Sequence, residues 1–391
     1  MKILLITYYF SPCGAIGAKR WNGFFNLSKD TKDIEFTVLT ANWKGKKASE
    51  SNINYLGEEI EYQAPKSINK EYSFWDTIKH PSIMIRSIDR SIFSQWRSEV
   101  INWINLNKDL KFDLVISSFG PSLCIYLGDY AKKIYKVPYV LDLRDLVSIQ
   151  GQKKKLPFFH YIDKKIDRFL TRNVDLFLTV SPTCKDKAMN FYNKKVDVIY
   201  NGLEAPLKYL EKEIGIELDK KSINIFYSGT LGTTRNPYKI IKIINEYLYQ
   251  NQNIKVNIIF ASQDNPYEFL IEKELFVDIE WVGYISKEKV IEYTNKCDAL
   301  LLLEDLSEEG NENLTGKLFE YLSSTKPIVV SCNKKSDIVR LINETNSGFL
   351  IENINDFEVF LNDKKFLNIE KINEYSREFQ FKKLIKVLKN V

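Results

Sequence analysis

The sequence has few of the residues that build metal sites and disulfide frameworks. Its 391 residues include two histidines and five cysteines, and the cysteines form no C-x-x-C pair. We therefore expect neither a zinc site nor a set of disulfides, and the free thiols suit a reducing compartment such as the cytoplasm. His80 and His160 are more typical of surface or structural positions than of a catalytic base.

Long apolar runs are also missing. No stretch approaches the roughly 20 apolar residues of a membrane-spanning helix. The N-terminal sequence MKILLITYYFSP has no cleavage site behind its short apolar run, so it predicts a buried strand and no signal peptide. The net charge of +5, from 56 basic and 51 acidic residues, does not imply a nucleic-acid partner.

What the sequence does contain is a repeated alternation of short Ile, Val, Leu and Phe runs with amphipathic stretches. This alternation is typical of parallel strands that are covered by helices on both faces. In the first half we predict strands near residues 3–7, 36–40, 114–117, 139–142, 176–180 and 196–200. In the second half we predict them near 223–227, 256–260, 279–281, 299–303, 328–330 and 348–350.

The length and this double alternation predict two doubly wound α/β domains that face each other across a cleft. We place an N-terminal, acceptor-binding domain at residues 1–203 and a linker at 204–221. A C-terminal, nucleotide-binding domain follows at 222–370. The basic segment 371–391 predicts a helical tail, which could pack back on the N-terminal domain.

A glycine-bearing turn, SPCGAIGAKR, follows the first predicted strand. Gly14 and Gly17 would let the backbone approach a phosphate at the start of the next helix, where N–H groups are unpaired. Arg20 could hold a phosphate or carboxylate, or simply cap a surface. Because any tight strand-to-helix turn favours glycine, a purely structural role for the turn stays open.

A stronger pattern is NENLTGKLFEYLSSTKPIVV, which lies between two predicted strands. Glu312 and Glu320 stand eight residues apart, a little over two helical turns. Glu320 could accept hydrogen bonds from the vicinal hydroxyls of a ribose. Thr315 and Gly316 would begin a helix whose N–H groups favour anions, and Lys317 adds a positive charge. The structural alternative is a capped, solvated helix.

These residues resemble the retaining glycosyltransferases of family 4, which have the GT-B fold, and the similarity extends over essentially the whole chain. The spacing of Glu312 and Glu320 matches the E-x7-E pattern of that family. The resemblance implies that Glu320 holds the nucleotide ribose and that Glu312 lies near the donor sugar.

A second match is FYSGTLGTTRNPYKII, which resembles the strand, loop and helix that bind the donor diphosphate in the family. It contributes Gly229. Thr230 stands where the family commonly has an arginine, and Arg235 stands where it commonly has a lysine. The resemblance suggests that Lys317 replaces the missing charge, as in the subgroup with a TGKLFEYL-like motif.

The third match is YVLDLRDL, at the end of a predicted strand. It places Asp142, Arg144 and Asp145 at the cleft, with Asp142 and Arg144 as catalytic candidates. Arg144 stands where many family members have a histidine, and the motif resembles a subgroup that acts in bacterial surface-polysaccharide synthesis. A buried Asp–Arg pair that braces the loop is the alternative.

The resemblance implies transfer of a sugar, with retention, from a nucleotide sugar, with uridine as the expected base. The acceptor would be a glycan or a lipid-linked sugar in capsule, O-antigen or exopolysaccharide synthesis. We expect no essential metal, because no D-x-D-like pair is present and cations with a helix dipole can stabilise a leaving diphosphate. The rival hypotheses are a UDP-sugar 2-epimerase and a non-catalytic nucleotide-sugar-binding protein.

The expected location is the cytoplasm, with peripheral contact to an anionic membrane as an open alternative. One aromatic and basic segment in the first half would suit such a contact. Its residues are Trp75, Phe93, Trp96, Trp103, Arg86, Arg90 and Arg97. A tryptophan stripe at helical spacing is more often part of a core than a membrane anchor. A second basic segment contains Lys153–Lys155, Lys164, Lys165, Arg168 and Arg172.

Overall fold

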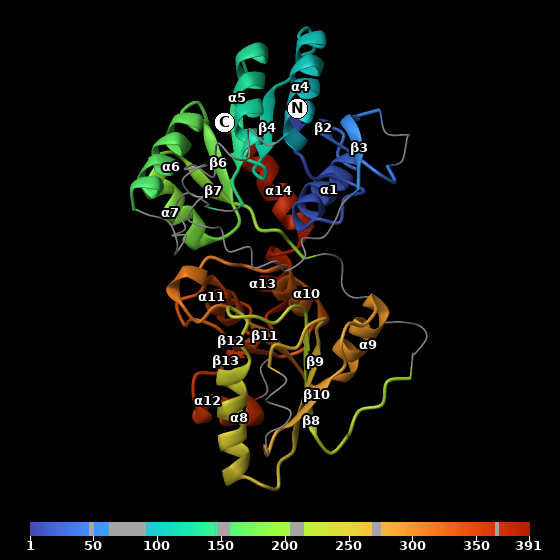
Figure 1. Cartoon of the computed structure of the whole chain (residues 1–391), viewed down its shortest axis with the longest axis vertical. Helices are drawn as coiled ribbons and strands as arrows, with labels where there is room; N and C mark the ends of the chain where they lie inside the picture. Colours follow the sequence, from blue (N-terminus) through green and yellow to red (C-terminus); the bar gives the residue numbers. More distant parts are fainter. Residues whose placement is uncertain are drawn as a thin grey trace. The chain divides into compact units, whose positions relative to one another are not determined.

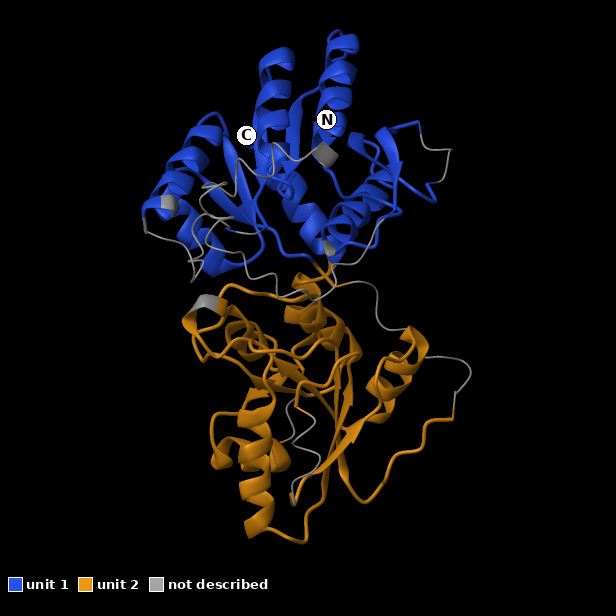
Figure 2. Ribbon diagram, in the orientation of Figure 1, with its two compact units in different colours: residues 1–201, 377–391 blue, residues 202–376 orange. Residues whose placement is uncertain are grey.

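The computed structural model describes residues 1–46, 51–61, 91–144, 146, 157–203, 215–267, 275–363 and 367–391. The chain divides into two compact units (Figures 1 and 2). Unit 1 contains residues 1–201 and 377–391, and unit 2 contains residues 202–376. The C-terminal segment therefore returns to the first unit.

Unit 1 is built on a parallel sheet of seven strands in the order β3-β2-β1-β4-β5-β6-β7. Its strands are β1 (Lys2–Ile6), β2 (Glu35–Trp43), β3 (Ile53–Ile60), β4 (Leu114–Ser118), β5 (Tyr139–Asp142), β6 (Leu176–Thr179) and β7 (Val196–Val198). Its helices are α1 (Ile16–Lys29), α4 (Ser91–Leu106), α5 (Leu123–Tyr135), α6 (Pro157–Leu170), α7 (Pro182–Tyr192) and α14 (Arg377–Leu388).

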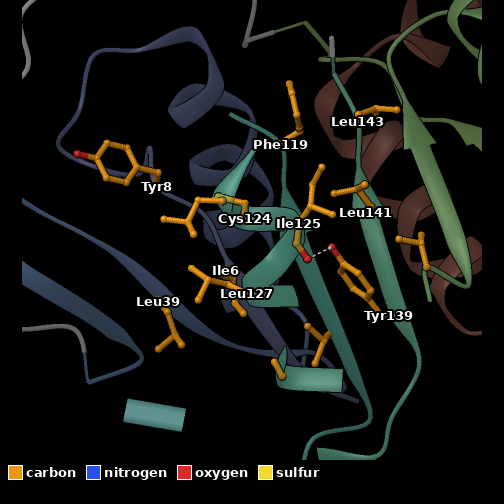
Figure 3. Packing of buried hydrophobic residues seen from close by; sticks show 14 of the residues in the cluster. Ile6, Tyr8, Leu39, Phe119, Cys124, Ile125, Leu127, Tyr139, Leu141 and Leu143 are labelled. Atoms are coloured by element: carbon orange, nitrogen blue, oxygen red, sulfur yellow. Dashed lines mark hydrogen bonds between the residues drawn. The ribbon is translucent and has the colours of Figure 1, made fainter. Parts of the chain in front are cut away.

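Two apolar cores cover the two faces of this sheet. On one face α1 and α14 pack together, and the Phe24 and Phe381 rings stack with centroids 6.2 Å apart. On the other face α4 and α5 cover the strands, and Figure 3 shows Cys124, Leu127 and Tyr139 among the side chains of that core. Burial on both faces explains why the central strands are continuously apolar.

Unit 2 is built on a parallel sheet of six strands in the order β10-β9-β8-β11-β12-β13. Its strands are β8 (Ile223–Ser228), β9 (Val256–Ala261), β10 (Asp278–Trp281), β11 (Ala299–Leu303), β12 (Ile328–Ser331) and β13 (Gly348–Leu350). Its helices are α8 (Tyr238–Gln250), α9 (Lys287–Lys296), the short 3-10 helix η2 (Glu308–Gly310), α10 (Gly316–Ser324), α11 (Asp337–Glu344), α12 (Ile354–Asn362) and α13 (Ile369–Glu374).

Each sheet has one point where the strand order reverses. In unit 1 the reversal lies between β1 and β4, and in unit 2 it lies between β8 and β11. In doubly wound sheets, ligands bind outside the carboxyl ends of the strands at this point, because the connecting loops diverge there. Both reversals are where the glycine-bearing turns of the sequence fall, after β1 and after β8.

Candidate functional site

The site in unit 2 begins with the turn that follows β8. Gly229 adopts φ +132°, a conformation that L side chains rarely adopt, so glycine is required for the backbone alone. A Cβ atom at this position would also overlap the ammonium group of Lys317. The missing side chain therefore makes room for a cation that comes from α10.

Lys317 lies in the first turn of α10 and contacts the end of β8. Its Nζ donates a hydrogen bond to the Tyr227 hydroxyl at 3.1 Å and lies 4.3 Å from the centre of the Tyr227 ring. The Tyr227 hydroxyl in turn donates to the carbonyl oxygen of Thr230 at 2.7 Å. These contacts fix the ammonium group at the reversal point of the sheet.

Lys317 is a buried lysine whose pKa is lowered toward neutrality. Burial and, next, the neighbouring Arg235 cation lower the pKa of Lys317 to about 7, against the opposing effects of Glu304 and Glu320. A buried ammonium group beside another cation is stabilised by any added negative charge. The site therefore favours an anionic ligand.

Arg235 is the second cation of the site. Its Nε lies 3.1 Å from Oε1 of Glu304, and Nη1 donates to the Thr230 hydroxyl at 3.4 Å. Glu304 follows β11 directly and is 6% exposed, so burial raises its pKa, while Arg235 and Lys317 oppose that shift. Glu304 thus orients Arg235 directly and leaves Lys317 without a carboxylate at hydrogen-bond distance among the described contacts.

The two glutamates of the E-x7-E pattern differ in exposure. Glu312 precedes α10 and is 1% exposed, whereas Glu320 lies on α10 and is exposed to solvent. Thr315 is the N-cap residue of α10, and Gly316 is its first residue. The structure thus brings Gly229, Thr230, Arg235, Thr315, Gly316 and Lys317 together around the start of α10, with Glu320 on the same helix.

The loop before α10 contains buried polar atoms that have no hydrogen-bond partner among the described residues. They are the Ser307 hydroxyl and the Asn311 side-chain oxygen, and the Ser331 hydroxyl at the end of β12 shares this property. Leaving such a group unpaired costs about 1–3 kcal/mol. This loop is therefore the part of unit 2 that gains most from a polar partner.

In unit 1 the reversal point holds an arginine. The guanidinium group of Arg144, two residues after β5, occupies the space that a Cβ atom on Gly17 would fill, and Nη2 donates to the carbonyl oxygen of Phe119 at 2.8 Å. A Cβ atom on Gly120 would lie 3.2 Å from the same nitrogen. Gly14, in the turn before α1, is exposed. Arg144 and Gly17 thus meet at the start of α1.

Arg20 and Asp142 have a different place from the one expected. Both side chains are buried, and they form a two-pronged ion pair, with Nε donating to Oδ2 at 3.2 Å and Nη2 donating to Oδ1 at 3.1 Å. Trp21 Nε1 donates to the same carboxylate at 2.8 Å, and Arg20 Nη1 donates to the carbonyl oxygens of Ile199 and Tyr200. Neither charge faces solvent, so in this structure the pair braces β5 against α1, and the expected roles of the two residues in donor binding and catalysis stay predictions. The buried Asp–Arg pair exists, but its arginine is Arg20.

The aromatic segment expected at a membrane is largely core. Trp96 is 2% exposed, and Phe93 and Trp103 pack against the core beneath α4. Trp103 Nε1 also donates to the side-chain oxygen of Asn54 at 3.1 Å. The core alternative is therefore correct for α4, while Trp75, Arg86, Arg90 and Asp145 lie outside the described residues.

Two residues of the unit 2 site were given no role by the sequence. Glu304 pairs with Arg235 and lies outside the quoted motifs, and Tyr227 lies in the FYSGTLGTTRNPYKII motif but was not singled out there. Glu304 did leave a signal, since it is the first charged residue after the apolar strand ALLLL.

Among the helices that the structure describes, each is too short or too polar to cross a bilayer.

Two family models match consecutive parts of the chain. The model described as Glycosyltransferase Family 4 matches residues 30–205, and the model described as Glycosyl transferases group 1 matches residues 211–378. An uncharacterized glycosyltransferase of Methanocaldococcus jannaschii is 20% identical over 406 aligned positions, which cover 100% of this chain and 97% of that protein.

Solved structures share the fold at low sequence identity. Sucrose-phosphate synthase of Thermosynechococcus elongatus aligns with a TM-score of 0.62 at 11% identity, covering 100% of this chain and 98% of that one. The lipopolysaccharide outer core galactosyltransferase WaaB aligns with a TM-score of 0.58 at 18% identity, covering both chains fully. With two parallel-sheet units and these matches, the chain is a glycosyltransferase of GT-B fold, matched by the Family 4 model in its first part and by the group 1 model in its second.

Proposed function

We propose that unit 2 binds the diphosphate of a nucleotide-sugar donor at the start of α10. The observation that supports this most is the convergence of Lys317 and Arg235 on one helix N-terminus at the reversal point of the sheet. Helix N-termini and fixed cations together bind phosphate, because the N–H dipoles and the charges act on the same oxygens. Tyr227 and Glu304 hold the two cations in place before the ligand arrives.

We propose that the rest of the donor lies on either side of this anion site. Glu320 is exposed on α10 and is the candidate acceptor for the ribose hydroxyls. The sugar is assigned to the loop of residues 304–315, where polar atoms lack partners, with Glu312 as its ligand. Since Glu312 is 1% exposed, this contact requires the loop to move when the donor binds.

The proposed reaction is transfer of the sugar, with retention, to a glycan or a lipid-linked acceptor. As the bond between the sugar and the diphosphate breaks, negative charge develops on the leaving oxygen, and Lys317 and Arg235 would stabilise it. Arg144 stays a candidate catalytic residue in unit 1, where the acceptor is expected to bind. We propose no essential metal, because two side-chain cations already supply charge to the diphosphate.

Two solved relatives support the choice of donor and pathway. The Anabaena protein Alr3699/HepE, at a TM-score of 0.53 and 11% identity over the full length of both chains, was solved in complex with UDP-glucose. WaaB, described above, acts in lipopolysaccharide assembly by its name. On this basis we propose a UDP-sugar donor and a role in bacterial capsule, O-antigen or exopolysaccharide synthesis in the cytoplasm.

Calorimetric titration with UDP, GDP and their sugar derivatives tests the donor site. Wild type should bind one nucleotide saturably, and Glu320→Ala should bind it about 10- to 100-fold more weakly, because hydrogen bonds to a charged group contribute about 1.5–3 kcal/mol. Glu358→Ala removes another exposed carboxylate, from α12, and should leave binding unchanged. The absence of binding by every nucleotide would overturn the proposal.

Product analysis with the donor alone separates transfer from epimerisation. A transferase should leave the donor sugar configuration unchanged and should consume donor when an acceptor is added. Accumulation of the C2 epimer without any acceptor would identify a 2-epimerase. Nucleotide binding with neither product would indicate a non-catalytic binding protein.

A further inference from the structure

Helix α6 presents three large aromatic side chains to solvent. Phe158 is 67% exposed, Tyr161 is 56% exposed and Phe169 is 62% exposed. They fall on one face of the helix, together with cations at the same spacing of three to four residues. That face, which we call the α6 face, consists of Phe158, Tyr161, Lys165, Arg168, Phe169 and, just beyond the helix end, Arg172.

The charges of α6 are separated by sign. Its two acidic residues, Asp163 and Asp167, are each 3% exposed, and the Tyr192 hydroxyl donates to Asp167 Oδ2 at 2.9 Å. Lys165 and Arg168 are exposed on the opposite side. The inward side also carries Ile166, which packs against the core of unit 1. Burial of both carboxylates leaves the outward side with positive charge alone.

Cations and aromatic rings of the α6 face contact one another. Lys165 Nζ lies 4.7 Å from the centre of the Tyr161 ring, and Arg172 Cζ lies 3.8 Å from that of Phe169. Arg168 Cζ lies 4.5 Å from the ring of Phe191, on the neighbouring helix α7. Apolar stems and rings thus lie beneath charged ends, an arrangement that suits a boundary between hydrocarbon and water.

We propose that the α6 face docks on the surface of an anionic phospholipid bilayer. The rings would enter the boundary between headgroups and acyl chains, while the cations would pair with lipid phosphates. With 14 residues the helix spans only about 21 Å, so it would lie along the surface. The inference does not depend on the transfer reaction proposed above, although it would bring unit 1 to a lipid-linked acceptor.

A second copy of the chain fits this face less well than a membrane. In a two-fold symmetric dimer the same patch meets itself, so the cations of one copy would oppose those of the other. An anionic bilayer complements the charge and accepts the aromatic rings at the same time. An acidic protein would complement the charge but would have to cover three separate exposed rings as well.

Vesicle sedimentation tests the proposal. The full chain should pellet with vesicles that contain phosphatidylglycerol, should stay in solution with pure phosphatidylcholine, and should be released as salt rises. Lys165→Glu/Arg172→Glu should weaken binding on the order of 25-fold or more, at about 5-fold for each cation lost. Phe158→Ser/Phe169→Ser should weaken it on the order of 10-fold.

Control variants in unit 2 carry comparable changes, with two cations reversed in one and two exposed rings removed in the other. Lys287→Glu/Lys289→Glu reverses two exposed charges on α9, and Tyr249→Ser/Tyr284→Ser removes two exposed rings. Both should bind vesicles as wild type does. The proposal would be overturned if the wild type did not bind anionic vesicles at low salt. It would also be overturned if the α6 variants bound them as tightly as the controls do.

Two further measurements keep other outcomes distinct. Sedimentation velocity without lipid shows whether the wild type is a dimer and whether Phe158→Ser/Phe169→Ser makes it monomeric. A dimer that depends on these rings, in a protein that does not bind vesicles, would overturn the membrane assignment. UDP titration without vesicles reports the donor site separately. Because all substituted residues are exposed, circular dichroism should show each variant folded.

Discussion

Binding of UDP should weaken as the pH rises from 7.0 to 8.5, and Lys317 should cause the change. In the free protein, burial and Arg235 hold the pKa of Lys317 at about 7. A bound diphosphate would raise that pKa, because the opposite charge favours the ammonium form. Protonation and binding are therefore linked: binding above pH 7 requires uptake of a proton, whereas at lower pH the proton is already present.

The magnitude follows from the fraction of charged lysine. With a pKa of about 7, roughly half of the free protein is protonated at Lys317 at pH 7.0, and about 3% is protonated at pH 8.5. If the pKa in the complex lies at least one unit above 8.5, affinity should fall about 15-fold over this interval. The terminal phosphate of UDP has a pKa of about 6, so its own ionisation is nearly complete at the start.

Calorimetry in buffers of different ionisation enthalpy measures the linkage directly. At pH 8.0 wild type should take up about 0.9 proton for each UDP bound, and at pH 7.0 about half as many. Lys317→Met keeps an unbranched chain beside the Tyr227 ring but should bind more weakly, with neither proton uptake nor this pH dependence. A wild-type affinity that stays constant from pH 7.0 to 8.5, without proton uptake, would refute the assignment of Lys317 to the diphosphate.

Three shorter predictions concern the scaffold and the site. Asp142→Asn breaks the buried pair with Arg20, which should cost about 3–5 kcal/mol and lower the melting temperature by about 10 °C in calorimetry, while UDP affinity at low temperature stays unchanged. Gly229→Ala should displace Lys317 and weaken UDP binding at least 10-fold. Gly232→Ala is the control in the same loop and should bind UDP normally, because no described atom lies within 4 Å of the added methyl group. Treatment with EDTA should change neither UDP affinity nor the rate of transfer, and loss of either that Mg²⁺ restores would contradict the proposed role of the two cations.

Much of the fold followed from local patterns. The predicted strands of both halves coincide with observed strands to within a few residues, because strands buried on both faces must be continuously apolar. The strand that sequence reasoning missed is β3, which among the strands that the structure describes pairs with β2 alone and whose residues are only half-buried or exposed. An edge strand with the sequence INYLGEEI lacks the apolar run on which the prediction depended.

The chemical partners of charged residues were harder to predict, because each partner comes from a distant element. Arg20 and Asp142 are 122 positions apart, and nothing local to either residue indicates that they pair. Arg235 and Glu304 are 69 positions apart and meet only because β8 and β11 are neighbours in the sheet. Sequence motifs could name the cations of the site but not the carboxylate that orients one of them.

In both units a side-chain cation lies directly against a glycine at the reversal point of the sheet. In unit 1 the guanidinium group of Arg144 fills the space above Gly17, and in unit 2 the ammonium group of Lys317 fills the space above Gly229. A glycine whose missing side chain is replaced by a cation puts positive charge closer to the backbone than any other residue would allow. Glycines in such turns are commonly explained by backbone freedom, and Gly229 needs that freedom. Gly17 lies within α1 and shows no positive φ, so close approach of Arg144 is the sufficient reason for glycine there.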